Sequence, residues 1–274
     1  MEMAEPTKRI RVPDLIEKKR RGEKIVVLTA YDASMARILD RAGVDVLLVG
    51  DSLGNVILGF DTTLPVTLDA MVHHSAAVTR GADHALVVAD MPFLSFQVNV
   101  EETVRNAGRL MRDGGAAAVK LEGCRPVVDS VRRLVDIGIP VMGHLGLLPQ
   151  SVHQLGGYRQ QATREEDAAR LLEDALALEA AGAFAIVLES IPAAVAREAT
   201  AALRIPTIGI GAGPHCDGQV LVCYDMLGLS QGAVPPFVKK YAELGESIAR
   251  AAGEFAEDVR LGRFPAPAPE KEKK

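Results

Sequence analysis

Ionisable side chains stand at or just after the ends of five short apolar runs in the sequence. They are Asp51, Asp90, Lys120 with Glu122, His144, and Glu189. Each run is rich in Val, Ile, Leu or Ala and is typical of a strand that is buried on both faces. Because all strands of a parallel barrel end at the same mouth, we expect these side chains to converge there. Lys120 and Glu122 lie two residues apart in one run and therefore point to the same side.

The two aspartates, Asp51 and Asp90, are candidate ligands for a metal ion. Two carboxylates, completed by water and substrate oxygens, suit Mg²⁺, which prefers octahedral oxygen coordination and keeps some of its waters. The alternative is that each aspartate caps the helix that follows its strand. With Glu122 placed to hold a metal-bound water, the pattern favours the metal site.

Lys120 has two functional interpretations. It could form a Schiff base with a carbonyl substrate, or it could hold a substrate carboxylate or enolate by its charge. Acidic neighbours keep a lysine protonated, which favours the second interpretation. A salt bridge with Glu122 or Asp90 is the structural alternative.

Among the histidines, only His144 ends an apolar run, and we expect it to hydrogen-bond the substrate; a satisfied core histidine is the alternative. His73 and His74 are adjacent on a predicted helix, so they point apart and favour a surface role. No role is assigned to His84, His153 or His215.

A glycine-rich stretch, Gly209–Gly213, is similar to loops that cradle phosphates. In a dinucleotide-binding fold such a loop lies in the first strand-to-helix turn, with an acid roughly 20 residues later. Here it lies late in the chain, and tight turns at a barrel mouth explain it equally well. NAD is not implied.

The elements that position these residues alternate regularly. The apolar runs are Ile25–Ala30, Val46–Gly50, Ala85–Asp90, Ala117–Leu121, Pro140–His144, Phe184–Glu189, Pro206–Ile210 and Gln219–Cys223. Helical patterns lie between them at Ser34–Arg41, Leu68–Arg80, Glu101–Arg112, Pro126–Asp136 and Arg164–Ala181. Eight strands alternating with helices predict an α/β fold, a closed (βα)8 barrel of the TIM type. An open doubly wound sheet is the alternative.

Further helices are expected on both sides of the barrel. Asp14–Arg21 is predicted to close its bottom, and Pro235–Arg260 to form one or two helices after it. We therefore expect a single catalytic domain over residues 1–262. The Pro/Ala/Lys/Glu-rich segment 263–274 has little to bury and is predicted to be a disordered tail.

Composition excludes several classes of protein. The 274 residues are 48% hydrophobic and carry a net charge of −5, which favours a folded protein with one large core over a nucleic-acid binder. No apolar run approaches the roughly 18 residues of a membrane span, and no secretory signal precedes the first strand. Three cysteines without a C-x-x-C pair fit a reducing cytoplasm.

The motifs that carry these residues resemble those of ketopantoate hydroxymethyltransferases. They are Leu28–Asp32, Val49–Gly54, Thr63–Thr67, Ala89–Phe93, Val119–Glu122, Gly143–Gly146, Pro149–Ser151, Val187–Ser190, Ile208–Gly213 and Asp217–Val220. The resemblance covers about residues 10–255 with the motifs in unchanged order. One departure is Leu148, where the family usually has Thr before Pro149.

The resemblance implies an enzyme of pantothenate biosynthesis. Its acceptor would be 3-methyl-2-oxobutanoate, its one-carbon donor 5,10-methylenetetrahydrofolate and its product ketopantoate. Carried over by position, Asp51 and Asp90 bind Mg²⁺ and contact substrate, and Glu122 supports the metal through water. Ser52, Lys120 and His144 hold the 2-oxo acid, and Glu189 accepts its C3 proton. The family also implies a homo-oligomer, a decamer.

Two other functions remain open from the residues. The first is another Mg²⁺-dependent carbon–carbon lyase or aldolase on the same barrel, of the phosphoenolpyruvate mutase or isocitrate lyase type. Folate-dependent turnover would separate it from a hydroxymethyltransferase. The second is a non-catalytic barrel that binds a small molecule, against which the full set of ionisable strand ends argues.

Overall fold

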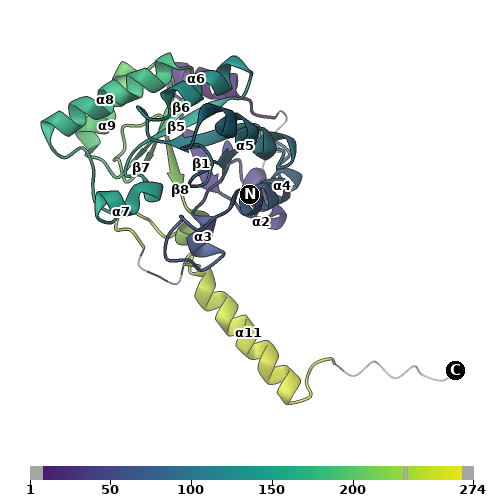
Figure 1. Cartoon of the computed structure of the whole chain (residues 1–274). Coiled ribbons are helices and arrows are strands. Elements are labelled where there is room, and N and C mark those ends of the chain that lie inside the picture. The colour runs from purple at the N-terminus through teal and green to yellow at the C-terminus, as the bar shows by residue number, and fades with distance from the viewer. Residues whose placement is uncertain (1–8, 231, 233, 267–274) are drawn as a thin grey trace. The chain divides into compact units, whose positions relative to one another are not determined.

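The computed structural model describes residues 9–230, 232 and 234–266. Eight parallel strands close into a barrel in sequence order (Figure 1). They are β1 (Ile25–Thr29), β2 (Val46–Val49), β3 (Leu86–Asp90), β4 (Ala118–Glu122), β5 (Val141–Gly146), β6 (Ala185–Glu189), β7 (Thr207–Ile210) and β8 (Gly218–Leu221). Strand β1 pairs with β8 from Ile25↔Gly218 to Leu28↔Leu221. This closing pair confirms the (βα)8 barrel and excludes the open sheet.

The longer helices surround the strands (Figure 1). They are α2 (Ala33–Arg41), α4 (Leu68–Gly81), α5 (Val100–Arg112), α6 (Val128–Asp136), α8 (Glu165–Ala180) and α9 (Ala193–Ala202). Short helical turns follow three strands: α3 (Leu53–Val56) after β2, η1 (Pro149–Ser151) with α7 (Val152–Leu155) after β5, and α10 (Cys223–Met226) after β8. Side-chain caps begin several of the longer helices. Asp32 accepts from the backbone N–H groups of Ser34 and Met35 at 2.8 Å at the start of α2.

The predicted strands agree with the structure to within one or two residues at each end, and five of the longer helices agree equally well. The helical patterns identified in the sequence do not include α9, because its run Ala-Ala-Val-Ala-Arg-Glu-Ala-Thr-Ala-Ala is mostly alanine and shows little apolar periodicity. Only Leu244–Arg260 (α11) of the predicted helical stretch Pro235–Arg260 is helical. Cys223, predicted as the end of the last strand, instead begins α10.

The helix α1 (Val12–Arg21) closes the amino end of the barrel, as expected. Its Leu15 is fully buried in the core cluster beneath Ile25 and Val27 of β1. Two ion pairs hold the helix there: Lys18 Nζ to Asp45 Oδ1 at 2.6 Å, and Lys19 Nζ to Asp217 Oδ2 at 2.8 Å. The apolar contact and the ion pairs together seal the bottom of the barrel.

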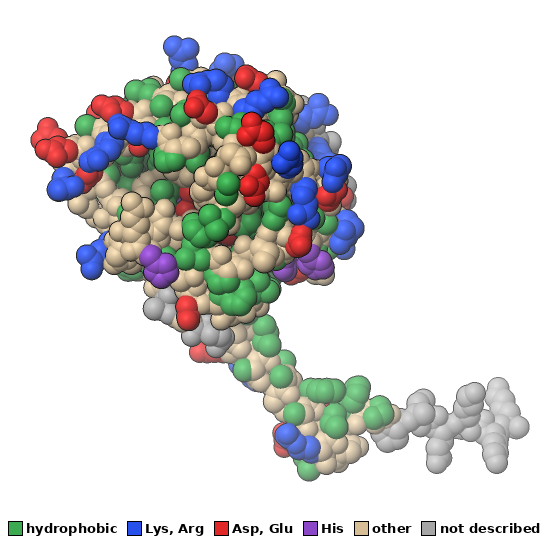
Figure 2. Space-filling view, viewed as in Figure 1, with side chains coloured by type: hydrophobic (Ala, Val, Ile, Leu, Met, Phe, Trp, Pro, Cys, Tyr) green, Lys and Arg blue, Asp and Glu red, His purple; other side chains and the backbone are tan. Residues whose placement is uncertain are grey.

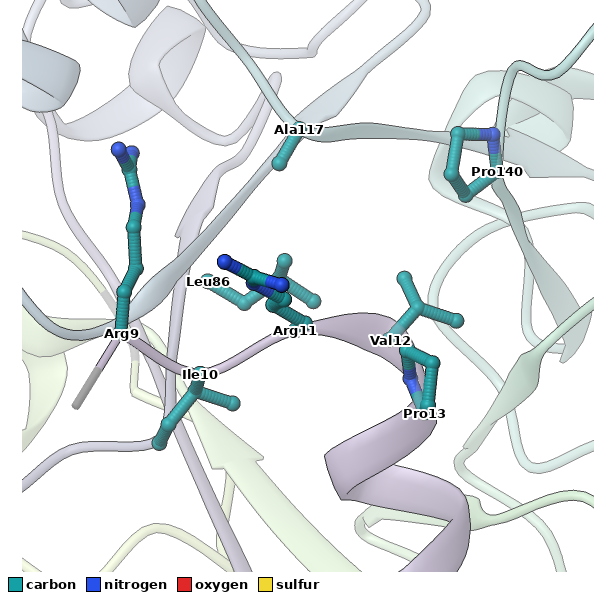
Figure 3. Close-up of a pocket in the computed structure, with 8 residues that line it drawn as sticks. All are labelled: Arg9, Ile10, Arg11, Val12, Pro13, Leu86, Ala117 and Pro140. Carbon is teal, nitrogen blue, oxygen red and sulfur yellow. The ribbon is translucent and has the colours of Figure 1, made fainter.

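A groove of about 470 Å³ lies at this same amino end (Figure 3). Its wall combines the segment Arg9–Pro13 with Leu86, Ala117 and Pro140, which stand at or before the starts of β3, β4 and β5. Because the ionisable residues stand at the opposite ends of these strands, the groove is separate from the candidate site.

The chain divides into two compact units, Met1–Cys223 and Tyr224–Lys274. The first contains the barrel. In the second, α11 buries none of its residues. The expected single domain over residues 1–262 stays a prediction, and most of the expected tail, residues 267–274, lies outside the described residues.

Charged side chains of both signs are interspersed over the face of the barrel seen in Figure 2. Within the described residues, no helix combines the length and apolar character that a membrane crossing requires.

Candidate active site

The barrel interior is layered, and the layering follows from the alternation of side chains along each strand. Inward-facing apolar residues fill the lower layers; examples are Leu86 and Val88 of β3, and Ala185 and Val187 of β6. Two residues further along the same strands, the inward position is ionisable. The inward positions beyond the apolar layers are Asp90, Lys120, Glu122, His144 and Glu189. The register keeps neighbours together, with Asp90 beside Lys120 and Glu122 beside His144.

Asp51 and Asp90 meet where β2 and β3 end. The backbone N–H of Asp51 donates to Oδ2 of Asp90 at 3.1 Å, and both side chains are buried. Gly50 leaves room for the Ser52 hydroxyl at this edge, because a Cβ there would lie 2.8 Å from Ser52 Oγ. Neither aspartate caps a helix: Ser52 is the N-cap of α3, and Asn99 is the N-cap of α5. The helix-capping alternative is therefore wrong.

Lys120 lies between an acid and an imidazole. Its Nζ is 3.0 Å from Asp90 Oδ1 and 3.2 Å from His144 Nδ1, and its side chain is only 6% exposed. Burial lowers the pKa of Lys120, but the carboxylates of Asp90, Glu122 and Asp51 outweigh it and raise the pKa above the ordinary value. The ammonium is thus held in its charged form.

His144 bridges two carboxylates. Its Nδ1 is 3.5 Å from Glu122 Oε1, and its Nε2 is 3.0 Å from Glu189 Oε2. Burial and Lys120 lower the pKa of His144, while Glu122 and Glu189 raise it, and the balance is a pKa of about 8. Despite this distance, the buried Nε2 makes no hydrogen bond inside the described part of the chain. A polar group of a bound substrate would supply the hydrogen-bond partner that this nitrogen lacks.

Gln150 is a site residue to which the sequence assigns no role. Its side-chain nitrogen donates to Asp51 Oδ2 and to the carbonyl of Met91, both at 2.9 Å. Its backbone N–H donates to Glu122 Oε2 at 3.0 Å. The only sequence signal for it is its place in the Pro149–Ser151 motif directly after β5.

The cluster has more negative than positive groups, which suits a bound cation. Burial, followed by the charges of Asp90 and Glu122, raises the pKa of Asp51 to about 8. Asp90 Oδ1 is buried and makes no hydrogen bond to any described residue, although Lys120 lies 3.0 Å away. No group of three or more His, Cys, Asp or Glu side chains in residues 9–230, 232 and 234–266 is arranged as a metal cage. A site built on Asp51 and Asp90 alone fits Mg²⁺, which commonly uses one or two carboxylates and keeps several waters.

Ser52 lies at the same edge, where its Oγ is 2.9 Å from the hydroxyl of the buried Tyr31. The other histidines lie outside this cluster. His74 is half-buried, with Nδ1 2.7 Å from the Tyr31 carbonyl, so the expected surface role fits only His73. His84 pairs with Asp40 at 3.1 Å. The His153 and His215 side chains are exposed.

The glycine-rich stretch forms turns after β7. Gly211 and Gly213 have positive φ angles of 61° and 77°. The side chain of Gln219 on β8 donates to the Gly213 carbonyl at 3.0 Å. The glycines thus allow a tight connection between two neighbouring strands without an intervening helix, in agreement with the tight-turn interpretation of this stretch.

Comparison with known proteins gives a consistent picture. The sequence profile described as ketopantoate hydroxymethyltransferase matches residues 9–267. The 3-methyl-2-oxobutanoate hydroxymethyltransferase of Caldicellulosiruptor bescii is 58% identical over 92% of this chain and 95% of its own length. The enzyme of the same name from Thermosynechococcus vestitus is 58% identical over 93% of this chain and 98% of its own.

Similar folds occur among solved structures of much lower sequence identity. Phosphonopyruvate hydrolase, solved with oxalate and Mg²⁺, has a TM-score of 0.62 at 12% identity, covering 95% of this chain and 92% of its own. A 2,3-dimethylmalate lyase of the phosphoenolpyruvate mutase/isocitrate lyase superfamily has a TM-score of 0.59 at 19% identity, with coverage of 95% and 88%. At these identities the likeness concerns the fold.

Proposed function

The chain belongs to the ketopantoate hydroxymethyltransferase family, and from this we propose that the barrel mouth catalyses a Mg²⁺-dependent, folate-dependent hydroxymethyl transfer. The enzyme transfers a hydroxymethyl group to 3-methyl-2-oxobutanoate and yields ketopantoate for pantothenate biosynthesis. The observation that carries the mechanism is the buried cluster itself. It places a constrained lysine, a histidine and four carboxylates at the end of the barrel where enzymes of this fold bind substrates.

Asp51 and Asp90 are the proposed Mg²⁺ ligands, with Glu122 and water completing the site. The raised pKa of Asp51 supports this assignment, since the buried negative charges lack sufficient positive partners. When bound, Mg²⁺ would act as a Lewis acid toward the ketone and carboxylate oxygens of the 2-oxo acid. Neutral substitutes for either aspartate are expected to weaken metal binding.

Lys120, His144 and Ser52 are proposed to hold the 2-oxo acid. The Lys120 ammonium, kept charged by Asp90, adds positive charge where the enolate develops. Ser52 donates its hydroxyl hydrogen bond from the edge of β2, supported by Tyr31. Because Lys120 stays protonated, it acts through its charge and does not form a Schiff base with the substrate carbonyl.

Glu189 is the proposed general base for the C3 proton. It ends β6 and points inward beside His144, and its side chain is 17% exposed. Its backbone is held on both sides: the Glu189 carbonyl accepts from Leu147 N–H at 2.8 Å, and Ser190 N–H donates to the Ile210 carbonyl at 2.8 Å. The N-cap of α9 is Pro192, so Glu189 does not cap this helix. A fixed carboxylate next to a buried imidazole is well placed to take a carbon-bound proton.

The proposed one-carbon donor is 5,10-methylenetetrahydrofolate, whose pterin ring is large and flat. Loops that follow the carboxyl ends of β2, β3 and β5 expose the apolar side chains of Phe60, Leu94 and Tyr158. Burial raises the pKa of Tyr158, as do the charges of Glu189, Asp51 and Glu122, which supports a position over the mouth. Such a rim suits a ring that must bring its methylene carbon to the enolate.

A homo-oligomeric, decameric assembly and a cytoplasmic location are also proposed. Helix α11 exposes Leu244, Ile248, Phe255 and Val259 and buries none of its residues, which supports a protein partner for this segment. Cys124 and Cys216 are free and buried, in keeping with a reducing compartment.

A turnover assay tests the proposed function directly. Purified protein is given 3-methyl-2-oxobutanoate and 5,10-methylenetetrahydrofolate, with Mg²⁺ or with excess EDTA after removal of metal. We expect ketopantoate only in the presence of both substrates and Mg²⁺. Full turnover of the metal-free protein in EDTA would contradict the metal site, and turnover without folate would contradict the donor.

A further inference from the structure

Hydrogen bonds of Gln150 connect the end of β5 to the ends of three other strands. It follows β5, while its partners Asp51, Met91 and Glu122 stand at or after the ends of β2, β3 and β4. Its side chain is buried, and two of these three partners are carboxylates of the active site. Gln150 therefore joins two carboxylates of the active site to the backbone that follows β3.

The orientation of the Gln150 amide is determined by its surroundings. Both hydrogens of the NH₂ group are used, one by Asp51 Oδ2 and one by the Met91 carbonyl. Its oxygen accepts a hydrogen bond of 3.0 Å from Gln97 Nε2. A flipped amide would place its oxygen against two acceptors and its NH₂ group against a donor, so only the observed orientation satisfies all partners.

This orientation controls the direction of the Asp51 carboxylate. Fixing Oδ2 of a planar carboxylate also fixes where its other oxygen, Oδ1, points. The Gln150 backbone N–H restrains Glu122 through Oε2 in the same manner. Carboxylates that bind metals are usually held by such hydrogen bonds, and loss of these partners typically weakens metal affinity 10–100-fold.

We propose that Gln150 is a positioning residue that orients Asp51 for Mg²⁺ binding and restrains Glu122 beside it. This inference rests on the proposed Mg²⁺-dependent function. Gln150 acts through the carboxylates and touches neither substrate nor metal.

The variant Gln150→Met tests the proposal, because methionine has a similar volume but no donor for Asp51. We expect Mg²⁺ to bind the folded variant about 10–100-fold more weakly than the wild type in isothermal titration calorimetry. The matched control is Gln154→Met, since Gln154 is exposed on the adjacent helix α7. We expect the control to bind Mg²⁺ as the wild type does.

Kinetics at varied Mg²⁺ separate positioning from a purely structural role. A positioning role predicts that activity lost by Gln150→Met at low Mg²⁺ returns as the Mg²⁺ concentration is raised. A folded variant with lower thermal stability but wild-type Mg²⁺ affinity would overturn the proposal. Failure of the proposed function looks different, since the wild type itself would then bind no Mg²⁺ or would turn over in EDTA.

A second variant keeps the test decisive if Gln150→Met does not fold. Gln97→Met removes the donor to Gln150 Oε1, together with the acceptor of a long, 3.4 Å hydrogen bond from Phe96 N–H, and it changes an exposed residue. We expect a smaller loss of Mg²⁺ affinity in the same direction. Unchanged affinity in Gln97→Met, together with an unfolded Gln150→Met, would assign Gln150 to folding and overturn the proposal.

Discussion

Replacement of Glu189 by glutamine isolates the proposed proton-transfer step. The carboxamide matches the carboxylate in size, so its oxygen can take the place of Glu189 Oε2, which lies 3.0 Å from His144 Nε2. The variant therefore keeps the shape of the site and removes the basic group. Metal and oxo-acid binding are expected to be largely retained, because Asp51, Asp90 and Lys120 are unchanged.

The size of the effect follows from the surroundings of Glu189. With 17% of its side chain exposed, Glu189 is close to solvent. In the variant, water can therefore take the place of the carboxylate as proton acceptor, but it is a much weaker base. Loss of a positioned general base typically slows a reaction 10²–10⁴-fold, which corresponds to about 2.7–5.4 kcal/mol in activation free energy. Loss of the adjacent charge also lowers the pKa of His144 from about 8, since Glu189 is one of the two carboxylates that raise it.

Deuterium incorporation at C3 of 3-methyl-2-oxobutanoate, followed by NMR in D₂O with Mg²⁺ and without folate, measures this step alone. We expect Glu189→Gln to slow exchange 10²–10⁴-fold. Glu198→Gln is the control, since Glu198 is exposed on α9, the helix that follows β6. Exchange by Glu189→Gln at the wild-type rate would show that another group removes the proton, and the assignment of Glu189 would be refuted.

Three further predictions concern the charged groups of the barrel. Borohydride treatment in the presence of the oxo acid leaves the mass of the protein unchanged, because carboxylates keep Lys120 protonated. The metal-free protein loses thermal stability as the pH rises from about 6.5 to 8. Burial and neighbouring acids raise the pKa of Asp51 to about 8, and Glu122 and Glu189 raise the pKa of His144 to about 8 against the effect of burial. The folded state therefore binds more protons than the unfolded chain in this pH window. Asp217→Asn lowers the free energy of unfolding by about 1–3 kcal/mol in urea denaturation, because Asp217 accepts from Lys19 Nζ and Thr207 N–H, both at 2.8 Å.

Each of these predictions has a clear contrary result. A covalent adduct mapped to Lys120 would indicate a Schiff base. Metal-free melting temperatures that rise between pH 6.5 and 8 would contradict the raised pKa values of Asp51 and His144, and Asp51→Asn is expected to flatten the profile. An Asp217→Asn variant within about 0.5 kcal/mol of the wild type would mean that its network contributes no more than a typical surface group.

The barrel itself could be predicted from the sequence, because its determinants are local. Buried strands such as Val46–Val49 are short continuous apolar runs. The helices between them show a regular spacing of apolar residues that can be recognised from the sequence alone. The strand-end positions of Asp90, Lys120, Glu122 and Glu189 follow from the same runs. A parallel barrel brings all strand ends to one mouth, so the sequence also predicts that these residues lie in one cluster.

The contacts within that cluster were decided by the tertiary structure. Gln150 binds a carboxylate 99 positions away in the chain, and no periodic pattern reports such a pairing. The pairing of His144 with Glu189 and the closeness of Tyr31 to Ser52 depend likewise on strand register and on the turn after each strand. Local propensity determines which residues face the barrel interior, whereas packing of distant segments determines which atoms meet there and how burial and neighbouring charges shift their pKa values.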